Sequence, residues 1–139
     1  MLVKNYYSII NSAFSGSQRT VKEIQSGREE LPNGFIARNS DSILIRYGSG
    51  DTAASVDDYK LSEEIGTVKG TIAQTETSTS VIGFIANSGS ETVIIKEIGI
   101  SVDLKVLASN YVVLFSRTVL DKPIELLPGD IIAINTQFA

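Results

Sequence analysis

Three aspartates in one polar stretch come closest, by residue type and spacing, to a metal site. Asp51, Asp57 and Asp58 lie within residues 47–61, directly after the apolar run at residues 43–45. Calcium takes about six to eight oxygen ligands, and its loops usually supply them at alternate residues together with a bidentate glutamate. The spacing here does not provide that set. The sequence therefore favours capping and solvated turn carboxylates, and we predict no metal ion.

Acidic and nucleophilic residues elsewhere form no recognisable catalytic arrangement. The pairs Glu29-Glu30 and Glu63-Glu64 could suggest a glycosidase, but adjacent residues point apart, and two carboxylates must face each other across a cleft. Without histidine there is no Ser-His-Asp triad. The Gly-Ser-Gly of residues 48–50 is too short to cradle a phosphate. We therefore expect no catalytic residue, no cofactor and no enzyme, and a hydrolase using acidic residues alone remains an alternative.

The charge of the chain argues against a nucleic-acid partner. Its formal net charge is −4, its pI is near 4.8 and its basic residues are scattered. No apolar run approaches the roughly 20 residues of a membrane helix. The amino terminus lacks the pattern of a signal peptide. We expect a soluble protein that is made in the cytoplasm.

We call residues 47–61 the strap, because their pattern predicts an irregular segment that lies across a rigid body. Gly48 and Gly50 would let the preceding strand end in a sharp turn by adopting backbone angles that side chains forbid. Ser55 and Asp58 have the spacing of a one-turn cap. Tyr59 and Leu61 are placed to anchor the far end.

The amino-terminal residues have the spacing of a helix face. Apolar side chains recur at residues 2, 6, 9, 10 and 13, and Gly16 could end the helix. A strand is the alternative, because Tyr and Ile favour strands. Further on, the pattern is weak: a short strand at 20–24 turning at 26–27, a solvated charged loop at 28–30, and a turn at 31–34.

Clear strand signals follow at intervals near ten residues. We predict strands at residues 42–47, 67–75, 80–87, 92–103, 111–120, 123–126 and 131–138. Residues 80–87 are apolar on both faces, which predicts burial on two sides. The connections expected are a hairpin turn at 87–90, a loop at 105–110 and a type II turn at 127–130.

These elements predict an antiparallel β-sandwich, jelly-roll or immunoglobulin-like, in one domain covering residues 1–139. Within it, residues 1–17 would form the helix or a docking arm, and residues 18–139 the sandwich. The rings of Tyr6, Tyr7 and Tyr111 belong to the core by default, although they could serve an interface. Residues 67–79, rich in Thr and Ser with few charges, form a candidate subunit contact or an exposed ribbon.

Three blocks of this sequence resemble small virion proteins of tailed bacteriophages. The first combines a strand, a glycine-rich turn, small residues and the anchor Asp58-Tyr59-Lys60-Leu61. The second runs from Val93 to Ile100 and contains Glu97-Ile98-Gly99, and the third runs from Arg117 through Pro123 to Pro128-Gly129-Asp130. Their order and rough spacing agree over about residues 43–135. The departures are Ser49, where Thr is usual, and Ile100, where Leu is usual.

The resemblance implies a non-enzymatic structural component of a phage particle, such as a capsid decoration, a head fibre or a collar or tail-associated protein. The expected partners are other virion proteins and further copies of the chain, with neither nucleic acid nor membrane. The expected location is the virion. The alternative function is a carbohydrate- or receptor-binding β-sandwich module of a tail fibre.

Overall fold

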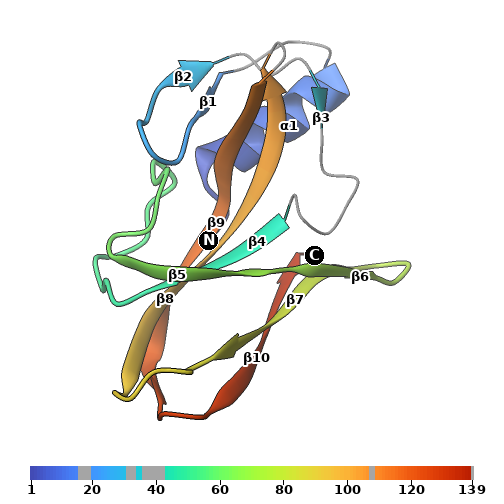
Figure 1. The fold of residues 1–139 in the computed structure, drawn as a ribbon. Helices are drawn as coiled ribbons and strands as arrows, with labels where there is room; N and C mark the ends of the chain where they lie inside the picture. Colours follow the sequence, from blue (N-terminus) through green and yellow to red (C-terminus); the bar gives the residue numbers. More distant parts are fainter. Residues whose placement is uncertain (16–19, 31–33, 36–42, 107–108, 139) are drawn as a thin grey trace.

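The computed structural model describes residues 1–15, 20–30, 34–35, 43–106 and 109–138. Its fold is an antiparallel β-sandwich with one short amino-terminal helix, as the sequence predicts (Figure 1). The elements are, in chain order, α1 (Lys4–Ser15), β1 (Val21–Lys22), β2 (Glu29–Glu30), β3 (Gly34–Phe35), β4 (Ile43–Gly48), β5 (Glu64–Lys69), β6 (Thr71–Gln74), β7 (Thr79–Ala86), β8 (Val93–Val106), β9 (Ser109–Leu126) and β10 (Ile131–Phe138).

Two sheets form the sandwich. In the larger sheet β8 is central: it pairs with β9 along one edge and with β4 and β3 along the other, and β5 pairs with β4. The smaller sheet has the order β10-β7-β6. A separate two-stranded sheet joins β1 to β2. Every one of these strand pairs is antiparallel.

The main core lies between the two sheets and is made mostly of isoleucine. Alternation along each strand sends every second side chain inward. β-Branched residues fit this pleated, half-buried surface well. The buried members of the core are Ile43, Ile45, Val81, Ile85, Ile95, Ile98, Ile100 and Leu126.

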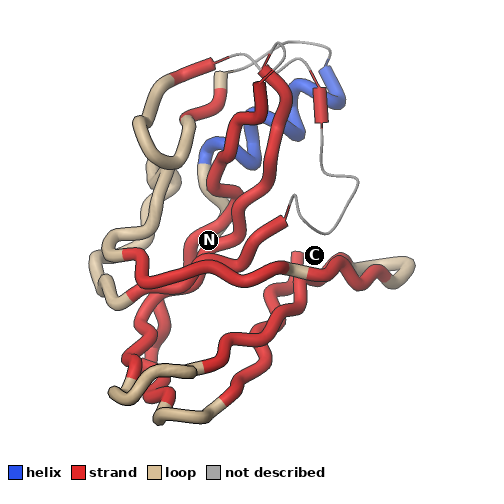
Figure 2. Tube along the Cα trace, in the orientation of Figure 1, coloured by secondary structure: helices blue, strands red, loops and turns tan. Residues whose placement is uncertain are grey.

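The β8–β9 hairpin extends beyond the smaller sheet, and the helix covers its far end (Figure 2). Ile9 of α1 and Val21 of β1 pack against Tyr111 and Val113 of β9 in a second buried cluster. The chain start lies along the outer edge of β9, where Met1 and Val3 exchange backbone hydrogen bonds with residues 115–117. No helix among the described residues is long and apolar enough to cross a bilayer.

The sequence prediction for β7 is wrong on one face. Val81, Gly83 and Ile85 point into the core and are buried, but Phe84 on the opposite face is 65% exposed. The larger sheet covers one face of the smaller sheet, and no described element covers the other. An apolar pattern on both faces therefore did not mean burial on both.

Two connections also differ from prediction. The single strand expected at residues 67–75 is divided between the two sheets, because the chain passes from β5 to β6 at Gly70. A Cβ at Gly70 would lie 2.5 Å from Val81, so the crossing needs a glycine. Residues 87–90, predicted as a hairpin turn, instead carry the chain from β7 in one sheet to β8 in the other.

The strands β8 and β9 are longer than predicted. The loop expected at residues 105–110 shrinks, because β8 runs to Val106 and β9 begins at Ser109. β9 then continues to Leu126 as one strand and includes Pro123, which lies opposite an irregularity between Ile95 and Glu97. An edge strand tolerates proline at such a point.

The predictions for loops and turns were confirmed in part. The loop expected at 28–30 contains β2, which pairs with β1. The turn at 127–130 is confirmed by a positive φ at Gly129 and a hydrogen bond from the backbone N–H of Asp130 to the carbonyl of Leu127. The helix stop at Gly16 and most of the turn at 31–34 lie outside the described residues.

Candidate functional site

Backbone N–H groups from both ends of the loop between β4 and β5, together with one arginine, converge on a single buried carboxylate. Glu97 of β8 is completely inaccessible to solvent and lies where the strap crosses the larger sheet. Its Oε1 accepts hydrogen bonds from the backbone N–H groups of Gly50 (3.2 Å) and Glu63 (2.7 Å). Its Oε2 accepts from the N–H of Ser62 (3.0 Å) and from Nε of Arg117 (2.8 Å). One carboxylate thus holds both ends of the loop between β4 and β5.

Arg117 of β9 holds the middle of the strap. Its side chain is 2% exposed, and Nη2 donates to the carbonyl of Thr52 (2.7 Å). Nη1 donates to Oδ2 of Asp58 at 2.8 Å and to the carbonyl of Ala53 at 3.5 Å. Because an arginine offers donors in a fixed fork, it can fix several acceptors of an irregular loop at once.

The electrostatics of this cluster favour the charged forms. Burial by itself would raise the pKa of Glu97, but the N–H groups of Glu63 and Ser62 and the Arg117 guanidinium hold that pKa below its ordinary value. Burial would likewise lower the pKa of Arg117, but Asp58 and Glu97 raise it. Among the described residues, no buried side-chain nitrogen or oxygen lacks a hydrogen-bond partner. The cluster therefore stabilises the fold, and its donors and acceptors are already occupied.

Gly48 and Gly50 are needed for space, which corrects the reason predicted for them. Positive φ occurs at Gly27 and Gly129 among the described glycines, and at neither strap position. A Cβ at Gly48 would lie 2.3 Å from the carbonyl oxygen of Glu63, and one at Gly50 would lie 2.6 Å from Oε1 of Glu97. Only glycine lets the backbone approach the carboxylate so closely.

The three strap aspartates are separated in space. Asp51 pairs with Lys96, Asp57 with Lys4, and Asp58 with Arg117. Among the described residues, no group of three or more Asp, Glu, His or Cys side chains could hold a metal ion. The predicted cap at Ser55 is confirmed, because its N–H donates to the carboxylate of Asp58 at 2.8 Å and its Oγ accepts from the N–H of Asp57.

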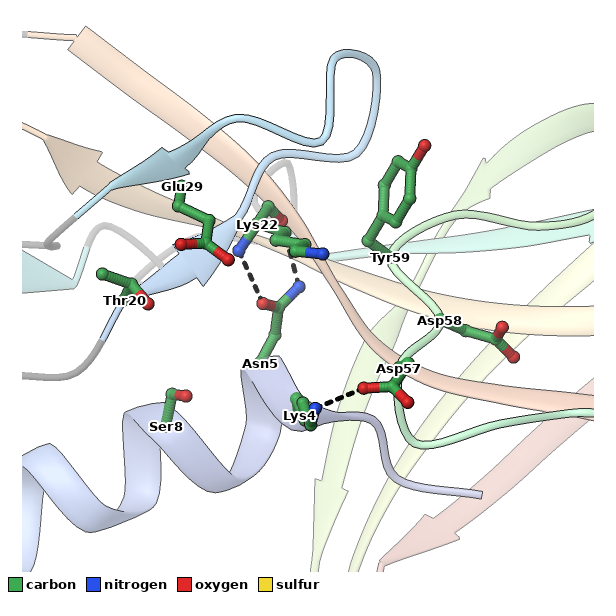
Figure 3. A pocket seen from close by; sticks show the side chains of 9 residues that line it. All are labelled: Lys4, Asn5, Ser8, Thr20, Lys22, Glu29, Asp57, Asp58 and Tyr59. Atoms are coloured by element: carbon green, nitrogen blue, oxygen red, sulfur yellow. Dashed lines mark hydrogen bonds and ion pairs between the residues drawn. The ribbon is translucent and has the colours of Figure 1, made fainter.

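A small hollow of about 170 Å³ lies between α1, β1 and the strap (Figure 3). Lys4 points to Asp57 across it, whereas Asp58 points away. The side chain of Asn5 bonds to the backbone N–H and carbonyl of Lys22 at 2.7 and 3.0 Å. Pockets for small ligands usually measure roughly 300–1,000 Å³. The hollow is smaller than that, and its contacts join the helix to β1 and the strap.

The other candidate residues named from the sequence lie in different parts of the structure. Glu64 pairs with Arg46, and the carboxylate of Glu63 accepts from Ser49. Glu29 lies beside the small hollow. Tyr111 is buried and donates to the carbonyl of Arg28, whereas Tyr7 is 49% exposed.

Residues 67–79 lie at the opposite margin of the sandwich from β10. They comprise the end of β5, the short edge strand β6 and the turn that leads into β7. All four residues of β6 are exposed. Their role as a subunit contact stays a prediction.

The side of the smaller sheet that faces away from the core is uncharged. We call this surface the outer face; its residues, which point away from the core on β6, β7 and β10, are Thr71, Ala73, Ser80, Ile82, Phe84, Ala86, Ile131, Ala133, Asn135 and Gln137. No charged residue is among them, although 20% of the chain is charged. Phe84 and Ile131 are 65% and 66% exposed. An ordinary antiparallel sheet presents polar residues on its solvent side.

Comparisons of the chain with family models, with curated proteins and with solved structures find no match.

Proposed function

We propose that the chain is a non-enzymatic structural component of a tailed-phage virion, a capsid decoration, head fibre or collar or tail-associated protein, which acts through protein–protein contacts. Its partners are other virion proteins and further copies of itself. The observation that carries the contact function is the uncharged outer face. The phage assignment rests on the resemblance of the three sequence blocks.

The outer face has the features of a protein contact. Depletion of charge and enrichment of aromatic residues distinguish the centre of protein interfaces from the rest of a surface. Phe84 lies opposite Ala133, and Ala86 lies opposite Ile131, so the large side chains stand beside small ones. A partner whose side chains project over Ala133 and Ala86 could pack closely against this surface. The net charge of −4 and the absence of any basic residue on the outer face disfavour nucleic acid and anionic lipid as partners.

The size of the outer face suits repeated contacts. A stable one-to-one interface uses roughly 20–30 residues on each side, more than the outer face contains. On a particle with many identical sites, several weak contacts of linked copies combine into firm attachment. The proposal therefore includes multiple copies per particle.

The resemblance and the geometry agree in one further respect. Asp58, Glu97 and Arg117 belong to the first, second and third resembling blocks, and the three residues meet in the buried cluster beneath the strap. The residues that carry the resemblance are thus used to build the fold. This supports a structural family whose members keep a scaffold.

The test is co-sedimentation of the purified chain with particles of the phage that encodes it. We expect the wild-type chain to pellet with particles and the double variant Phe84→Ser/Ile131→Thr to stay in the supernatant. The control is Ile65→Thr, which removes an exposed apolar side chain (46%) from β5, outside the outer face. A wild-type chain that never pellets with particles would contradict the virion role. Specific binding on a glycan array would support the receptor-binding alternative instead.

A further inference from the structure

The free edge of β10 differs from the other edges of the sandwich. β10 pairs with β7 over all eight residues from Ile131 to Phe138, with no shift of register, and its other edge pairs with no described strand. The strand contains no charged residue and no proline. A long regular edge of this kind presents a row of backbone N–H and C=O groups that can pair with another chain.

The other long edges are protected. The outer edge of β9 is covered over residues 112–117 by the chain start and by residues 23–24. Beyond that point β9 carries Asp121, Lys122, Pro123 and Glu125. β5 begins and ends with a charge, at Glu64 and Lys69, and its pairing with β4 contains a register shift. Charges, prolines and bulges are the devices that prevent edge pairing, and among the described edges of six residues or more β10 alone lacks them all.

A second hollow lies beside this edge. We call it the edge hollow; it measures about 430 Å³ and is lined by Ile98 of β8, Thr118 and Leu120 of β9, and residues 133–137 of β10. Ile98 is buried, and Leu120 and Ile134 are half-buried. A strand added to β10 would cover the edge hollow and place apolar side chains in it.

From the unprotected edge and the edge hollow we infer that two copies of the chain pair antiparallel through β10 and form a symmetric dimer. The inference rests on the proposed function, to which it adds the surface and the symmetry of self-association. The second copy fits this edge because β10 itself is an uncharged strand with alternating apolar residues. Neither partner then brings a charge of either sign into the contact. A two-fold contact also closes, so it leaves no free β10 edge for further growth.

In this dimer Ile134 of one copy lies opposite Ile134 of the other, and the two-fold axis passes midway between them. Residues opposite each other in an antiparallel pair share a face, so in a symmetric pair one residue must lie opposite its own copy. In this register the two Ile134 side chains meet beside the edge hollow, and Ala133 lies opposite Asn135 of the other copy. The two smaller sheets then form one continuous sheet. The outer faces of both copies lie side by side on it, which doubles the uncharged surface.

The first test is the oligomeric state of the purified chain without particles, measured by sedimentation velocity over a range of concentrations. We expect wild type to approach twice the 15.0 kDa of the monomer. In Ala133→Lys/Asn135→Lys, each introduced lysine lies directly opposite another, and we expect at least a tenfold weaker dimer. The matched control Thr71→Lys/Ala73→Lys adds the same charge to β6 and should dimerise as wild type does. A wild type that is monomeric throughout, or an equal loss in the control, would overturn the inference.

The second test maps the contact with single cysteines, since the chain contains none. Paired residues of antiparallel strands lie about 4.5–5.5 Å apart between Cα atoms, which is within the range of a disulfide. We expect Ile134→Cys to form a disulfide-linked dimer under mild oxidation and Phe84→Cys, two strands from the axis, to remain a monomer on non-reducing gels. Cross-linking through position 84 instead would indicate face-to-face packing and overturn the edge contact. Because both tests omit particles, their failure is distinguishable from failure of the virion role.

Discussion

Nε of Arg117 donates a hydrogen bond of 2.8 Å to Oε2 of Glu97, and neither side chain is more than 2% exposed. The two residues lie on neighbouring strands of the larger sheet, and each also bonds to the strap. A buried ion pair is costly to form, yet removing one partner leaves an uncompensated buried charge. The pair therefore makes the irregular strap part of the folded core.

Arg117→Met should destabilise the protein by about 3–5 kcal/mol, because Glu97 would remain buried without its cation. The free energy of unfolding from urea titration checks this value. Lys96→Met is the control, since the Lys96–Asp51 pair is largely exposed and should contribute less than about 1 kcal/mol. Equal losses of unfolding free energy in the two variants would show that the buried pair contributes no more to stability than the exposed pair does.

The stability of the protein should fall in acid, partly through Glu97. The pKa of Glu97 is lower in the folded state than its ordinary value of 4.5, so the unfolded chain binds the proton more readily. The stabilisation is present above pH 4.5 and is lost as the pH falls through the folded pKa. Urea unfolding between pH 7 and pH 3 should show a smaller acid-dependent loss in Glu97→Gln than in wild type.

Some pH dependence of stability should remain in Glu97→Gln, because the pKa values of Glu23 and Asp57 are also lowered by hydrogen bonds and nearby cations. If Glu97→Gln lost as much stability in acid as wild type does, Glu97 would not contribute to the pH dependence.

Gly48→Ala should destabilise the fold through overpacking, by about 1–3 kcal/mol. The added Cβ would overlap the backbone carbonyl of Glu63, which flexible side chains cannot relieve. Gly89→Ala is the matched control, because its Cβ would be 3.4 Å from its nearest neighbour, Asn87. Thermal unfolding of both variants distinguishes a need for space at position 48 from a general cost of replacing glycine in this protein.

Leu61→Ala should lower the free energy of unfolding by about 2–5 kcal/mol, as truncation of a buried leucine does. Leu61 is 3% exposed and packs in a buried cluster with Val3, Ile24 and Leu114. Tyr59→Ala should cost less, because the Tyr59 ring is half-buried at the surface, with the amines of Lys22 and Lys60 at 5.7 and 5.8 Å from its centre. A larger loss for Tyr59→Ala would make the ring the main anchor of the strap.

The elements that the sequence predicts well have strong local signals. The amino-terminal helix, β4, β10 and the turn at residues 127–130 all follow from spacing or turn chemistry within a few residues. The exchange of hydrogen bonds between Ser55 and Asp58 is likewise local. Such features depend on backbone preferences and side-chain alternation, which neighbouring residues determine.

The buried cluster could not be found in the same way, although one signal was present. Glu97 lies among the isoleucines of residues 94–100, and Arg117 is the only charged residue of the strand predicted at residues 111–120. A charged residue in a strand ordinarily indicates a solvated position, and the partner that reverses this interpretation is 20 residues away. Only the pairing of β8 with β9 brings the charges together.

The sequence by itself predicted the antiparallel sandwich, because alternating apolar residues with a turn about every ten residues are typical of antiparallel strands in packed sheets. The tertiary structure decided which face each strand buries, because the pattern of one strand does not say what lies above or below it. The same apolar alternation fills the core at Val81 and Ile85 and leaves Phe84 and Ile131 exposed. The tertiary structure also separates the strap aspartates and brings Asp58 to Arg117 and Glu97, since that contact unites three segments that are distant in the sequence.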